Sequence, residues 1–97
     1  MKLHELKTDP ELFDDVWCGE KTFEIRFNDR DFKTGDILWL RRTQHSGELM
    51  KREVCPLPLM YCSRSIVAQI TYILPGGYGL KDGWCILGIR VIENRNE

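Results

Sequence analysis

The stretch GEKTFEIR, residues 19–26, decides the fold because it joins a helix to a charged strand. Gly19 stands where a helix would end in a left-handed residue. Side chains of a strand alternate between its two faces, so Glu24 and Arg26 point the same way. We expect the opposite face, turned to the core, to consist of the apolar residues Phe23, Ile25 and Phe27. The charged face is then either a solvated ion pair or a site.

A helix is predicted immediately before this stretch. Thr8 is placed to cap it, Glu11 completes a capping box three residues later, and Pro10 fits the first turn. Apolar residues recur at helical spacing and form the expected buried stripe: Leu12, Phe13, Val16 and Trp17. The sequence therefore predicts a helix between Thr8 and Gly19.

Strand patterns account for most of the remaining chain. They cover residues 2–7, 21–27, 37–42, 64–74 and 84–92. Between residues 43 and 63 the sequence is irregular, and Pro56 and Pro58 exclude a central strand there. We predict a single α+β domain over residues 1–97, a compact and mostly antiparallel β-barrel packed by one or two helices.

Charge is unevenly distributed along a nearly neutral chain. The net charge of −1 argues against a general polyanion binder. Residues 1–20 carry two bases and six acids, whereas residues 21–52 carry eight bases and five acids. This asymmetry can create a local basic face that attracts a phosphate-bearing ligand, although charges scattered over a solvated surface remain the simpler interpretation. With neither a signal-peptide core nor a membrane-spanning run, we expect a cytoplasmic protein.

The sequence gives no sign of a metal or cofactor. Its four cysteines show no C-x-x-C spacing and no pairing with a nearby histidine. The glycine-rich turn at residues 75–79 lacks the following helix and the Lys-Ser/Thr ending of a phosphate-binding loop. His4 is expected to be a half-buried structural histidine. We expect neither a bound metal nor a cofactor.

Lys21, Glu24 and Arg26 are the candidate site residues. A carboxylate beside a guanidinium orients it and leaves other donors free for a phosphate or a base edge. Arg30, in the turn after the strand, and Tyr78, which could stack on a base, are candidate peripheral contacts. The residue pattern alone leaves an idle surface ion pair, contributing about 0–1 kcal/mol, as the favoured alternative.

The spacing Gly19-x-Lys21-x-x-Glu24-x-Arg26 resembles the G-x-K-x-x-E-x-R signature of ASCH domains, which belong to the PUA-like superfamily. The sequences NDRDFKTGDIL (28–38) and VAQITYIL (67–74) agree with this resemblance. The amino-terminal region is similar to small uncharacterised ASCH-like proteins of bacteria and their phages. The resemblance covers nearly the whole chain except about residues 44–60, where we expect a loop insertion.

This resemblance implies a PUA-like β-barrel whose motif lines a cleft between helix and barrel. It also implies that the ligand is RNA or a modified nucleoside, with Lys21, Glu24 and Arg26 as site residues and Gly19 shaping the turn. We therefore expect an RNA- or nucleotide-binding module. In this module Arg26 contacts a phosphate or a base edge, and Lys21 adds charge.

Two alternatives remain open from the sequence. The family includes an amidohydrolase of acetylated cytidine that uses a lysine, a threonine and a glutamate. If this chain were such an enzyme, Lys21 and Glu24 would be its catalytic residues, but Glu24 stands at the threonine position, which favours binding. A phage-derived protein-interaction domain is the second alternative, with the partner contacting residues 44–60. We expect no membrane partner, and the sequence leaves the oligomeric state open.

Overall fold

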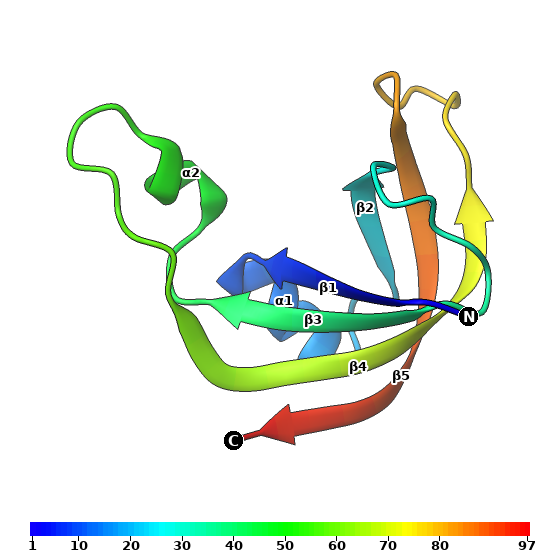
Figure 1. Cartoon of the computed structure of the whole chain (residues 1–97), viewed down its shortest axis with the longest axis horizontal. Helices are drawn as coiled ribbons and strands as arrows, with labels where there is room; N and C mark the ends of the chain where they lie inside the picture. The colour runs from blue at the N-terminus through cyan, green and yellow to red at the C-terminus, as the bar shows by residue number, and fades with distance from the viewer.

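The computed structural model describes residues 1–97 and contains one five-stranded sheet with two short helices (Figure 1). The elements in chain order are β1 (Leu3–Thr8), α1 (Pro10–Trp17), β2 (Phe23–Phe27), β3 (Ile37–Thr43), α2 (Gly47–Lys51), β4 (Tyr61–Leu74) and β5 (Trp84–Asn96). The strand order is β1-β3-β4-β5-β2, and every pairing except the parallel β1–β3 pair is antiparallel. Because the sheet curves into a half-barrel, the predicted α+β barrel-like fold is confirmed (Figure 1).

The hydrophobic core lies inside this half-barrel and is closed by α1. Twelve buried residues form it, and they come from α1, from every strand except β2, and from the loop after β2. Phe13 and Val16 of α1 are almost fully buried against the sheet. Burial of side chains of this size contributes about 1.5–3 kcal/mol each. The predicted helical stripe is therefore correct at its two central positions.

The sequence correctly predicts the carboxyl-terminal end of α1 but not its amino-terminal cap. Gly19 has φ +88° and follows the C-cap residue Cys18, as predicted. The capping role predicted for Thr8 is wrong, because Asp9 is the N-cap residue and no side chain bonds there. Thr8 is instead the last residue of β1, with its side chain buried inside the half-barrel.

The two faces of β2 are the reverse of the expected ones. Glu24 is only 3% exposed, whereas Phe23, Ile25 and Phe27 are 40–49% exposed. β2 is an edge strand that pairs only with β5, so its inner face borders a cleft instead of the packed core. The charged side chains therefore point inward, and the apolar ones lie at the rim.

Residues 44–60 leave the sheet between β3 and β4 and project from the body with α2 (Figure 1). The Ser46 hydroxyl caps α2 by accepting from the Leu49 amide at 3.3 Å. Asp9 Oδ1 accepts from the Gly47 amide at 2.9 Å. This second bond ties the start of α2 to the junction of β1 and α1. Neither helix of the structure is long and apolar enough to cross a membrane.

His4 is a structural residue, more deeply buried than expected. It is 6% exposed, and its Nε2 lies 2.8 Å from Asp36 Oδ2. Asp36 also accepts from the backbone amides of Lys2 and Lys33. The hydrogen bond from His4, followed by that from the Lys2 amide, lowers the pKa of Asp36 to about 2. This cluster fixes β1 to the turn that precedes β3.

Candidate functional site

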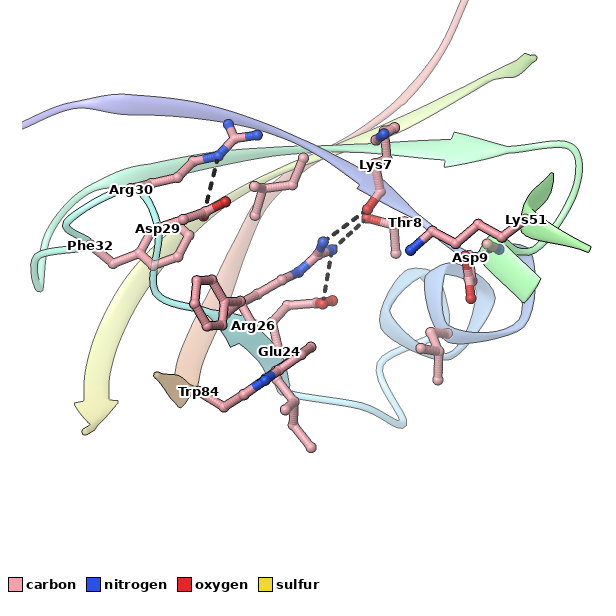
Figure 2. Close-up of a pocket in the computed structure, with 15 residues that line it drawn as sticks. Lys7, Thr8, Asp9, Glu24, Arg26, Asp29, Arg30, Phe32, Lys51 and Trp84 are labelled. Atoms are coloured by element: carbon pink, nitrogen blue, oxygen red, sulfur yellow. Dashed lines mark hydrogen bonds and ion pairs between the residues drawn. The ribbon is translucent and has the colours of Figure 1, made fainter. Parts of the chain in front are cut away.

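A cleft opens between β1 and β2, the two strands at the ends of the sheet order (Figure 2). Its volume is about 410 Å³, and its walls also include residues of α1, α2, β5 and the loop after β2. Because β1 and β2 do not pair, the half-barrel has an open seam, and the cleft lies along it. Four basic and three acidic side chains line the cleft: Lys7, Arg26, Arg30, Lys51, Asp9, Glu24 and Asp29.

Glu24 is a buried carboxylate held between two cations. Its Oε1 lies 3.2 Å from Lys21 Nζ, and its Oε2 lies 3.2 Å from Arg26 Nη2. The three side chains are 3%, 13% and 22% exposed, respectively. This degree of burial distinguishes the group from an ordinary surface ion pair, because solvent screens it far less. The alternation of residues correctly placed Glu24 beside Arg26.

Arg26 crosses the seam to β1. Its Nη1 donates to the Lys7 carbonyl at 2.9 Å, and its Nη2 donates to Thr8 Oγ1 at 3.1 Å (Figure 2). Its buried Nε has no hydrogen-bond partner. Each Nη of a guanidinium carries two N–H donors, so the second N–H on Nη1 remains available to a ligand. Glu24 orients Arg26, and Arg26 holds the two edge strands together.

Arg30 makes a second link of the same kind. Its Nη1 donates to the Glu5 carbonyl at 2.7 Å, while its Nε lies 3.9 Å from Asp29 Oδ1. Both arginines thus bind carbonyls on the unpaired edge of β1, where an exposed strand would otherwise present acceptors to another chain. The arginine side chains close the seam that backbone pairing leaves open.

Lys21 and Tyr78 do not line the cleft. Lys21 Nζ donates to the Phe23 carbonyl at 2.6 Å and to Glu24 Oε1 at 3.2 Å. Tyr78 is 83% exposed in the turn between β4 and β5. The structure therefore brings Glu24, Arg26 and Arg30 together at one cleft. Lys21 contacts Glu24 without lining the cleft, and Tyr78 lies apart.

One rim of the cleft is aromatic. Phe27 and Trp84 are paired across β2 and β5, with ring centroids 5.9 Å apart in an edge-to-face arrangement. They are 49% and 37% exposed, and Ile25 extends the apolar rim. A cleft that holds guanidinium groups and has exposed aromatic side chains at its rim is suited to planar, charged ligands.

The sequence interpretation missed several cleft residues, among them Thr8, Lys51 and Trp84. Thr8 was assigned to a helix cap, whereas β1 extends through it. The pairing of Phe27 with Trp84 depends on strand register, which separated segments do not reveal. Of these three residues, only Lys51 could have been suggested by the sequence, since it lies in the basic stretch of residues 21–52.

A separate charged cluster connects α1 to β3 outside the cleft. Arg42 donates through Nε and Nη2 to the two carboxylate oxygens of Asp14, at 2.9 and 3.2 Å. These hydrogen bonds from Arg42 lower the pKa of Asp14. The bidentate geometry fixes the helix to the sheet, which is a structural role.

The model of one protein family, described as a domain of unknown function (DUF3850), matches residues 3–89. The chain belongs to this family. The match includes every element of the fold up to the first half of β5, and so covers the complete cleft. No curated protein matches the chain. The chemistry of the cleft therefore carries the functional argument for this DUF3850 domain.

Proposed function

We propose that this domain binds a nucleotide or a short stretch of RNA in the cleft between β1 and β2. The observation that carries the proposal is the meeting of oriented guanidinium groups and an exposed aromatic rim in one cavity. A cavity of about 410 Å³ lies within the range of about 300–1,000 Å³ usual for small-ligand sites. The resemblance to ASCH domains supports the same ligand class.

Each part of the cleft has a role in this proposal. Phe27 and Trp84 offer the rim on which a base stacks. The remaining N–H of Arg26 and the exposed part of Arg30 supply donors to a phosphate or a base edge. Glu24 keeps the Arg26 guanidinium in place through their ion pair. Lys21 neutralises the buried Glu24 carboxylate and acts as a positioning residue.

The geometry favours binding over the hydrolase alternative. A catalytic Lys21 would need its amino group in the cleft, but Lys21 does not line the cleft, and its amino group is bonded to the Phe23 carbonyl and to Glu24. The protein-interaction alternative assigns residues 44–60 to a partner. In the structure, Gly47 and Lys51 of this segment line the same cleft, which links the segment to the ligand site.

The test is a titration of the ¹⁵N-labelled domain with the four ribonucleoside monophosphates and a short oligoribonucleotide at low salt. We expect shifts of amide signals in β1, β2 and β5 and a binding constant that weakens as salt is added. Arg26→Lys should weaken binding about tenfold or more, because lysine loses the forked guanidinium. Arg95→Lys is the matched control, since Arg95 pairs only with exposed acids outside the cleft. Absence of shifts with every ligand at low salt would refute the proposal.

A further inference from the structure

The cleft continues into a second cavity beneath α2. This cavity has a volume of about 430 Å³, and Lys7, Asp9 and Lys51 line both spaces. Beyond these shared residues, the second cavity is apolar, with Met50, Leu57 and Leu59 on its walls. The two spaces therefore form one trough with an aromatic end at β2 and β5 and an aliphatic end at residues 50–59.

A cation without an ion-pair partner lies where the two spaces join. Lys51 is exposed and takes part in no ion pair of the structure. Lys7 is also without an ion pair, but its side chain lies on the outer face of β1 and points away from Arg26 (Figure 2). Figure 2 shows the Lys51 side chain extending from α2 toward Thr8 and Arg26. Asp9 offsets part of this charge, and its Oδ1 is already bound to the Gly47 amide. Lys51 therefore supplies the unpaired positive charge at the junction.

An apolar site, a single positive charge and a second apolar site follow one another along the trough. A dinucleotide has the complementary order, with a base, one phosphodiester charge and a second base. A mononucleotide would leave the second cavity unfilled, and its terminal phosphate would carry more charge than the junction offsets. The two cavities share residues, so one continuous ligand can occupy both.

We propose that the ligand is an oligonucleotide of at least two residues, with its phosphodiester held by Lys51 between two base subsites. The first base lies against Phe27 and Trp84, and the second lies against Met50, Leu57 and Leu59. This proposal rests on the proposed function and specifies its ligand class. It also gives residues 44–60 a role, because they supply the lysine and the whole aliphatic subsite.

The experiment compares the Kd of the dinucleotide UpU with the Kd of UMP, by calorimetry or by signal shifts at fixed ionic strength. We expect UpU to bind at least tenfold more tightly. UpU with a neutral methylphosphonate linkage should lose most of that gain, because it lacks the phosphodiester charge. Lys51→Ala should weaken UpU binding and make the two UpU forms nearly equal in affinity.

The second subsite is tested with Leu59→Ser, a change at a side chain that is 48% exposed and so is compatible with folding. This variant should bring the ratio of the UMP and UpU binding constants toward one. Leu3→Ser, at an exposed apolar residue outside the trough, is the control and should leave the ratio unchanged. Equal affinity of the wild type for UMP and UpU overturns this inference and leaves the proposed function standing. If UMP, UpU and longer RNA all fail to bind, the proposed function itself is overturned.

Discussion

Glu24→Gln tests whether the buried charge cluster of β2 stabilises the fold. The substitution keeps the size of the side chain but removes the charge that Lys21 and Arg26 share, each at 3.2 Å. Glutamine can still accept from one of the two cations, while its NH₂ group faces the other. A hydrogen bond to a charged group contributes about 1.5–3 kcal/mol, and an unpaired buried group costs about 1–3 kcal/mol. We expect the free energy of unfolding to fall by about 2–3 kcal/mol.

The assay is urea unfolding followed by tryptophan fluorescence and circular dichroism, with thermal unfolding alongside. For a domain of this length the expected loss lowers Tm by about 8–15 °C. Glu93→Gln is the matched control, since Glu93 is exposed and lies 3.9 Å from Arg95, and it should change stability by less than about 0.5 kcal/mol. If Glu24→Gln is as mild as this control, the reasoning about the buried cluster is wrong.

Three further predictions concern stability. The folded-state pKa of Asp36, about 2, lies below the ordinary value of 3.8. The stabilisation from the Asp36 carboxylate is therefore complete above about pH 4 and is lost as the pH falls toward 2. Asp36→Asn should lower the free energy of unfolding by about 1–2 kcal/mol at pH 7, and urea unfolding at a series of pH values should show a weaker loss of stability in acid than in the wild type. Gly19→Ala should cost about 1 kcal/mol in the same assay, because φ is +88° and a Cβ would meet no atom within 4 Å, whereas Gly76→Ala, without a positive φ, should be nearly neutral. Phe13→Ala should lower the free energy of unfolding by about 3–5 kcal/mol, whereas Leu12→Ala, on the exposed side of the same helix, should lower it far less. Similar losses for the two variants would contradict the assigned core.

The sequence was sufficient for α1, for the five strands and for the two side chains that share a face of β2, but it did not predict α2. Gly19 signalled the end of α1 because few residues other than glycine adopt its backbone conformation. Alternation placed Glu24 and Arg26 on one face of β2, but it could not say which face was interior. That choice depends on the curvature of the sheet and on the edge position of β2, which are properties of the whole fold.

The composition of the cleft was harder to predict because it joins residues that are distant in sequence. Lys51 lies opposite β2 only because Asp9 fixes the start of α2 at the end of β1. Tyr78 was predicted as a site residue because tyrosine can stack on a base, but it lies in an exposed turn away from the cleft. Residue type indicated the chemistry of the site, and the topology determined which residues reach it.

The seam between β1 and β2 has a mechanical consequence. Two arginine side chains bridge it, through Lys7, Thr8 and Glu5, and no backbone ladder crosses it. The cleft can therefore widen by rotation of these side chains without breaking any pairing within the sheet. The width of the cleft is therefore set by the reach of Arg26 and Arg30, and not by the fixed spacing of a backbone ladder.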